Sequence, residues 1–162
     1  MRTYRVSASG VVNAPAGRVY AILADYRDGH PHIVPRPPFG ALEVEQGGVG
    51  AGTVIRYPMR LLGRTRTYRA AVTEPEPGRV LVETDVDTGA VTTFTVEPGA
   101  GGRSARVTIT TDVPTRGGPL GVLERFLVTR LLRPTYVREL RQLADFAEGR
   151  SRTPGSDAPA GG

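Results

Sequence analysis

The stretch VVNAPAGRVYAILADYRDGHPHIVP, residues 11–35, decides the fold, because it inserts a compact helical segment directly after a single strand. Residues 2–12 alternate in polarity, which predicts a half-buried strand. Asn13 and Pro15 are typical of a helix start, and the prolines that follow Val34 forbid helical continuation. We therefore expect two short helices between the first strand and the rest of the chain.

Alternating strand patterns and one long helical pattern make up the remainder of the folded part. Leu123 and Leu127 belong to an apolar stripe of the helix over residues 120–148, and Pro134 separates it from a second, out-of-phase stripe, which predicts a kink or short break. A sheet interrupted early by short helices and closed late by a long one predicts an α+β fold with the helix laid across the sheet. Six strand runs with Gly and Pro turns between them extend the first strand to a seven-stranded antiparallel sheet: residues 41–45, 53–59, 65–74, 79–85, 91–97 and 105–112.

Size and composition indicate one domain over residues 1–149, followed by a tail, residues 150–162, whose composition predicts disorder. No apolar run is long enough to span a membrane, and the N-terminus lacks the apolar core of a secretory signal. With no cysteine, the chain has no disulfide framework and no thiolate metal site. We expect a cytoplasmic protein that is monomeric or weakly dimeric.

The net charge of +5 comes from 21 arginines and no lysine, spread along the whole chain. A nucleic-acid footprint should instead cluster, so we expect no nucleic-acid partner. Four arginines fall broadly on one side of the long helix, and two interpretations stand: a solvated face, or a docking patch for an acidic partner such as a carrier protein. The four are Arg130, Arg133, Arg138 and Arg141.

Strand phase predicts which side chains face the helix and line an apolar pocket with a few polar tips, the usual composition of a small-molecule site. The alternative is that the same residues make a solid core. The predicted ligand-binding residues are Ile55, Tyr57, Met59, Tyr68, Phe94, Leu123 and Leu127.

Tyr57 and Tyr68 are the sharpest chemical candidates, since a buried phenol must find a partner. That partner is either a ligand carbonyl or the protein backbone. Arg56 and His32 are weaker catalytic candidates, and His32 stands with His30 in a segment expected at the mouth of the cavity, where a histidine is suited to acid–base chemistry. Two histidines without cysteine are too few for a metal site, and we expect neither a metal nor a cofactor.

The segment at 11–35 resembles the opening of the polyketide cyclase/dehydrase family of the START-like (SRPBCC, helix-grip) superfamily. GlyAlaGlyThr at 50–53, the turn at 73–79, ThrThrPheThrVal at 92–96 and the late helix ending ArgGluLeuArgGlnLeuAlaAspPheAlaGlu agree with it. The resemblance covers about residues 3–148. It implies a seven-stranded sheet gripping the long C-terminal helix around a ligand cavity, and no invariant catalytic motif.

Two functions follow from the pattern and the resemblance together. The first is binding of a hydrophobic, partly oxygenated small molecule, lipid-like or polyketide-like, in the cavity. The second is an enzyme of the aromatase/cyclase type, in which Tyr57, Tyr68, Arg56 or a histidine assists aldol cyclisation and dehydration of a poly-β-ketone held near its attack geometry.

Overall fold

The computed structural model describes residues 2–149, so the predicted tail at 150–162 lies outside the described residues. Two α-helices, α1 (Ala16–Ala24) and α2 (Gly118–Ala147), accompany two 3-10 turns, η1 (His30–His32) and η2 (Ala100–Gly102). The strands are β1 (Thr3–Val12), β2 (Glu43–Gln46), β3 (Val54–Leu61), β4 (Arg64–Glu76), β5 (Val80–Asp85), β6 (Val91–Pro98) and β7 (Ala105–Pro114).

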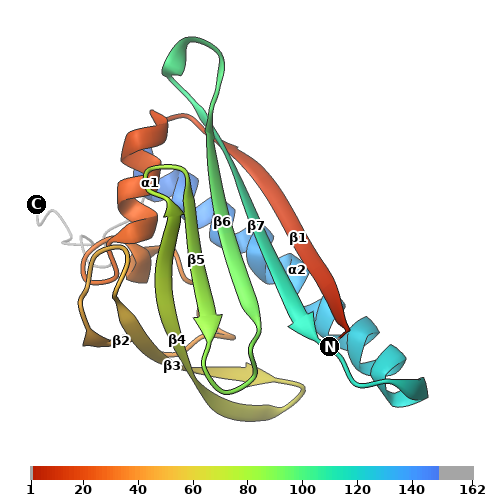
Figure 1. Cartoon of the computed structure of the whole chain (residues 1–162). Helices are drawn as coiled ribbons and strands as arrows, with labels where there is room; N and C mark the ends of the chain where they lie inside the picture. The colour runs from red at the N-terminus through yellow and green to blue at the C-terminus, as the bar shows by residue number, and fades with distance from the viewer. Residues whose placement is uncertain (1, 150–162) are drawn as a thin grey trace, which may run out of the picture.

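All seven strands form one antiparallel sheet in the order β1-β7-β6-β5-β4-β3-β2. Strands β2 to β7 are a meander, and β1 closes the order beside β7 because the helical segment at 16–32 carries the chain across to the opposite edge. Figure 1 shows the sheet strongly twisted, with α2 lying across it behind β1, β6 and β7 and α1 at one end. The predicted α+β helix-grip architecture is confirmed.

Two details of the helices differ from the sequence prediction. The second short helix is only the 3-10 turn His30–His32, since Pro31 and Pro35 leave room for a single turn. The long helix continues through Pro134 without a break. Leu132 and Tyr136 on either side of the proline are buried, so packing on the sheet holds the helix together despite the missing backbone bond.

Helix α2 runs in the same direction as β1. The Arg125 guanidinium lies 6.0 Å from the Tyr4 ring, near the start of β1, whereas a Cβ built on Gly10 would lie 3.5 Å from Leu140 Cβ. The first half of α2 therefore lies at the end of the sheet where β1 begins and β7 finishes, and the second half packs into the core through Leu143.

The glycine-rich loop between β2 and β3 ties the opposite end of the sheet to α1. The amide of Tyr26 donates to the Gly48 carbonyl, and the amide of Gly50 donates to the Ala24 carbonyl, both at 2.9 Å. Gly50 has φ +63, and a Cβ there would meet the Glu74 carboxylate at 2.4 Å. The left-handed backbone conformation is what favours glycine at this position, since the Glu74 side chain can move.

Candidate functional site

A pocket lies between the inner face of the sheet and α2, with a volume of about 260 Å³. Its walls come from strands β3 to β7, from Tyr4 of β1, from α2 and from the segment at 30–42. Arg66 and Glu124 are exposed members of the lining, so the pocket opens between the start of β4 and the first half of α2. The volume is just below the roughly 300–1,000 Å³ typical of small-molecule sites, which suits a compact ligand.

Five of the seven predicted ligand-binding residues line this pocket: Ile55, Tyr57, Met59, Tyr68 and Phe94. They come from β3, β4 and β6, and their alternation along each strand places them on the inner face. Strand phase is a reliable guide at these positions because the side-chain period of a strand is two. Their role in binding stays a prediction.

Leu123 and Leu127 are placed differently. They point away from the pocket and are 53% and 37% exposed, respectively. The lining positions of α2 are instead those around Val128, Leu132 and Tyr136. The reason is that apolar residues surround the first half of α2, so apolar spacing alone favours two helical faces equally; the buried face starts one residue later than predicted.

Arg56 and His32 also lie outside the pocket lining. Arg56 is exposed and lies opposite Glu43 in the register of β3 and β2, because its position in the strand alternation puts it on the outer face. His32 is exposed and stacks on Phe146, with ring centroids 4.7 Å apart. His30 is the buried histidine that lines the pocket.

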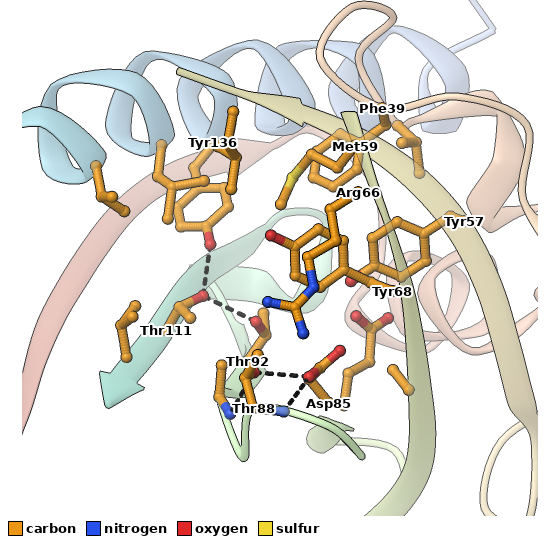
Figure 2. Close-up of a pocket in the computed structure, with 18 of the residues that line it drawn as sticks. Phe39, Tyr57, Met59, Arg66, Tyr68, Asp85, Thr88, Thr92, Thr111 and Tyr136 are labelled. Atoms are coloured by element: carbon orange, nitrogen blue, oxygen red, sulfur yellow. Dashed lines mark hydrogen bonds between the residues drawn. The ribbon is translucent and has the colours of Figure 1, made fainter. Parts of the chain in front are cut away.

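Three aromatic rings form one wall of the pocket (Figure 2). Tyr57 stacks on Tyr68 with centroids 5.9 Å apart, and Phe39 meets Tyr57 edge-on at 5.7 Å. Within residues 2–149 the hydroxyls of Tyr57 and Tyr68 make no hydrogen bond, so a ligand is their available partner. Burial, and next the charge of Glu83, raises the pKa of Tyr57 well above its ordinary value, which keeps this phenol protonated and able to donate.

Asp85, at the end of β5, offers an acceptor to the pocket. Its Oδ1 accepts from the Thr88 amide and hydroxyl, both at 2.6 Å, which fixes the β5–β6 turn. Its Oδ2 is buried and has no hydrogen-bond partner in the described part of the chain. The residue is only 6% exposed, and an unpaired buried carboxylate oxygen is costly. A bound molecule with a hydrogen-bond donor can satisfy this atom.

Two more carboxyl groups face the cavity from β5 and α2. Glu83 Oε1 accepts from the Tyr26 hydroxyl at 2.7 Å and lies 3.7 Å from His30 Nε2. Glu139 is 4% exposed, and burial, followed by the charge of Glu83, raises its pKa to about 8. Glu139 is therefore mostly protonated at neutral pH and presents a hydroxyl donor, whereas the pocket also contains carboxylate acceptors.

A chain of hydroxyls crosses the floor from β6 to α2 (Figure 2). The hydroxyls of Thr92 and Thr111 lie 2.8 Å apart, and that of Thr111 lies 2.5 Å from the Tyr136 hydroxyl. Burial raises the pKa of Tyr136. Because each hydroxyl forms a hydrogen bond with the next, this row of three hydroxyls holds α2 against the sheet.

Arg66 is the arginine of the pocket lining. Its guanidinium carbon lies 5.5 Å from the Tyr68 ring centroid, and Figure 2 shows the side chain extending across the opening toward Asp85. A cation at the mouth and an acceptor beneath it can together orient a molecule that carries both a carbonyl and a hydroxyl group.

Sequence reasoning missed the charged and hydroxyl lining. Arg66 shares strand parity with Tyr68, and Glu83 and Asp85 share it with the buried Leu81, so strict phase would have found them. Glu139 follows Tyr136 by three residues on α2, but a glutamate in a helix is normally assigned to solvent. No sequence signal marks its burial.

Residues 2–149 contain no group of three or more His, Cys, Asp or Glu side chains arranged to hold a metal ion. In the same part of the chain, no helix combines the length and apolarity needed to cross a bilayer.

The curled antiparallel sheet, the long C-terminal helix and the cavity between them define a START-like, helix-grip protein. Residues 3–148 match the model of the family described as polyketide cyclase/dehydrase and lipid transport, and the chain belongs to that family. A comparison with curated proteins finds no match.

Solved structures share the fold over nearly the whole chain. The solution structure of the KanY protein is 27% identical, with a TM-score of 0.80, covering 92% of this chain and 100% of that one. The Zhui aromatase/cyclase from Streptomyces sp. R1128 is 21% identical, with a TM-score of 0.75, covering 95% and 99%. A START superfamily protein from Mycobacterium smegmatis is 18% identical, with a TM-score of 0.69, covering 91% and 99%.

Proposed function

We propose that the protein binds a compact, hydrophobic and partly oxygenated molecule that is neutral and carries a hydroxyl donor. The observation that supports this most directly is Asp85 Oδ2, a buried acceptor without a partner in the described residues, at the side of an aromatic pocket. A ligand hydroxyl satisfies it, and a ligand carbonyl accepts from Arg66 or from the Tyr57 hydroxyl. With Glu83 and Asp85 in the same cavity, a carboxylate ligand is disfavoured by like charge.

A matched series of naphthalenes tests this ligand chemistry by calorimetry. The donor 2-naphthol should bind more tightly than 2-methoxynaphthalene, which has no donor, and than the anion 2-naphthoate. A hydrogen bond to a charged group is worth about 1.5–3 kcal/mol, so the expected ratio of dissociation constants between the first two is about 10- to 100-fold.

Asp85→Asn provides the sharpest variant. The amide keeps one oxygen for the Thr88 turn and replaces the pocket-facing acceptor by a donor, so the preference should invert toward 2-methoxynaphthalene. Asp28→Asn, at an exposed aspartate on the segment after α1, is the control and should leave the ratio unchanged. Equal affinities for all three naphthalenes in the wild type would refute the proposal.

The second candidate is aldol cyclisation and dehydration of a poly-β-ketone, the aromatase/cyclase activity named for one of the similar structures. Glu139 favours it, since an acid whose pKa is about 8 can donate a proton near neutral pH. In this reaction a carboxylate such as Asp85 accepts an α-proton and the enolate carbon bonds to a second carbonyl carbon. This C–C bond closes the ring as the oxygen of that carbonyl takes the Glu139 proton. In the dehydration that follows, the Glu139 carboxylate accepts a second α-proton and the hydroxyl leaves as water with the proton held by Asp85, which forms the C=C bond and restores both groups.

Turnover of a linear poly-β-ketone thioester separates the two candidates. An enzyme should lose about 100- to 10,000-fold in rate in Glu139→Gln, while naphthol binding changes little. Absence of cyclised product with the wild type would leave binding as the function. The cytoplasmic location, and an acidic carrier protein docking on the arginines of α2, stay predictions; Arg138 of that set donates to the Pro37 carbonyl at 3.0 Å.

A further inference from the structure

One end of the molecule combines features that the pocket does not use. We define the mouth surface as residues 60–66 of the β3–β4 hairpin, residues 86–89 of the β5–β6 turn, and residues 113–130, from the end of β7 through the first half of α2. Strand register places the hairpin, the β5–β6 turn and the end of β7 at the end of the sheet where the pocket opens. The contact of Arg125 with Tyr4 places the first half of α2 there too, and Figure 1 shows the hairpin and the start of α2 at this same end.

Exposed apolar side chains gather on the mouth surface. Single exposed apolar residues are ordinary, but a concentration of them marks an interaction site. The described residues contain ten large hydrophobic side chains with marked exposure, and seven belong to this surface, between 37% and 80% exposed: Leu62, Val86, Leu120, Val122, Leu123, Phe126 and Leu127.

Positive charge is concentrated on the same surface. Its segments contain six arginines against Asp87 and Glu124, which gives +4 of the chain's formal net charge of +5. The six are Arg60, Arg64, Arg66, Arg116, Arg125 and Arg130. The Arg130 guanidinium lies 5.5 Å from the Phe126 ring centroid, so cationic and apolar groups are interleaved rather than separated.

We propose that the mouth surface docks on a lipid bilayer with anionic headgroups. A helix that presents Leu and Phe side chains among arginines is typical of binding in the interfacial plane of a membrane, and each arginine near an anionic surface adds attraction. The apolar side chains come from a hairpin, a turn and a helix. A bilayer is deformable and can accommodate all three segments, whereas a protein partner would need a groove of matching shape. A second copy of the chain docked on this surface would place two mouth surfaces of charge +4 against each other, and their repulsion disfavours such a dimer.

Docking in this orientation leaves the fold intact and turns the pocket toward the lipid. Val128 and Leu132 on the inner face of α2 remain packed on the sheet, while the outer face of the same turns enters the interface. Arg66 at the mouth then lies at headgroup level, and an apolar ligand passes between bilayer and pocket without crossing bulk water.

Co-sedimentation with vesicles tests the docking without any pocket ligand. The protein should sediment with vesicles of phosphatidylcholine mixed with phosphatidylglycerol, not with phosphatidylcholine alone, and should be released by salt. Leu123→Ser with Phe126→Ser should weaken binding about tenfold or more through lost apolar contact. Arg64→Gln with Arg116→Gln should weaken it about fivefold per arginine.

The opposite end of the molecule offers matched controls. Val11→Ser with Val49→Ser removes two exposed apolar side chains there, and Arg18→Gln with Arg103→Gln removes two exposed arginines. Both control pairs should bind vesicles as the wild type does. Circular dichroism and urea unfolding of each variant confirm that differences in sedimentation come from the surface and not from loss of fold.

Three outcomes would overturn the proposal. The first is equal binding to neutral and anionic vesicles, or equal losses in the mouth-surface and control variants. The second is a dimer in sedimentation velocity that Leu123→Ser with Phe126→Ser dissociates, which would assign the surface to a second copy. The third is tighter binding to soluble polyglutamate than to anionic vesicles, which would assign it to an acidic protein.

Discussion

Replacing Glu139 by glutamine tests the electrostatics of the pocket through stability. Burial and the charge of Glu83 raise the pKa of Glu139 from 4.5 to about 8 in the folded protein. Between these two values the folded state keeps a proton that the unfolded state has released. The free energy of unfolding contributed by this group therefore falls as the pH rises, by about 1.4 kcal/mol per pH unit. Glutamine has no such proton to lose.

The expected magnitude is large enough to measure by urea unfolding. From about pH 5 to about pH 7, Glu139→Gln should gain about 3 kcal/mol of stability relative to the wild type, and the gain should level off above the folded pKa. The other ionisable groups that face this residue are Glu83, Tyr26 and Tyr136. They are present in both proteins, so their contributions cancel to first order in the difference.

The control is Glu43→Gln, an exposed glutamate on β2, for which the difference from the wild type should be nearly independent of pH. A flat difference for Glu139→Gln over the same range would refute the reasoning. It would mean that Glu139 is ionised in the folded protein at neutral pH and cannot serve as the hydroxyl donor or acid inferred above.

Two further predictions concern the attachment of α2. Tyr136→Phe removes the hydroxyl that lies 2.5 Å from that of Thr111 and should lower the free energy of unfolding by about 0.5–1.5 kcal/mol in urea, the range for a neutral hydrogen bond; no change would show that the hydroxyl chain contributes nothing net. Gly121→Ala would place a Cβ 1.9 Å from the Arg116 carbonyl oxygen and should cost about 1–3 kcal/mol. Gly117→Ala meets no atom within 4 Å and should stay within about 0.5 kcal/mol; equal losses in both would contradict the close approach.

The sheet could be predicted closely from the sequence because strand alternation and turn residues agree along the chain. Phe94 and Val96, for example, alternate with polar residues on β6, so a single inward phase satisfies the pattern. Turn glycines such as Gly78 and Gly89 have positive φ, which only a few residues tolerate, and they limit each strand. Local rules and the tertiary fold coincide at these positions.

The helical side of the site could not be predicted in the same way. In the first half of α2, Leu123 and Leu127 face outward while Val128 and Leu132 face the sheet. Apolar spacing alone cannot choose between two apolar faces. Glu139 could not be predicted for a different reason. Burial of a carboxyl group is unfavourable in itself, so the sequence favours an exposed position, and only the packing of the surrounding strands shows that the side chain is buried.

The buried carboxyl groups and the exposed leucines both depart from the rule that charged side chains face solvent and apolar side chains face the core. Both departures occur near the pocket. Neither improves the stability of an isolated domain, since buried carboxyl groups cost free energy and exposed leucines gain none. Sequences that depart from their own local preferences usually do so at functional sites. Asp85 and Glu139 line the pocket, and the exposed Leu123 and Phe126 belong to the mouth surface, at the end of the molecule where the pocket opens. Because the pocket opens at the mouth surface, ligand chemistry and membrane docking should be tested on the same protein. A bilayer docked there would cover the exposed Phe126, and a ligand that enters the pocket from that bilayer would bring the hydrogen-bond donor that Asp85 Oδ2 lacks.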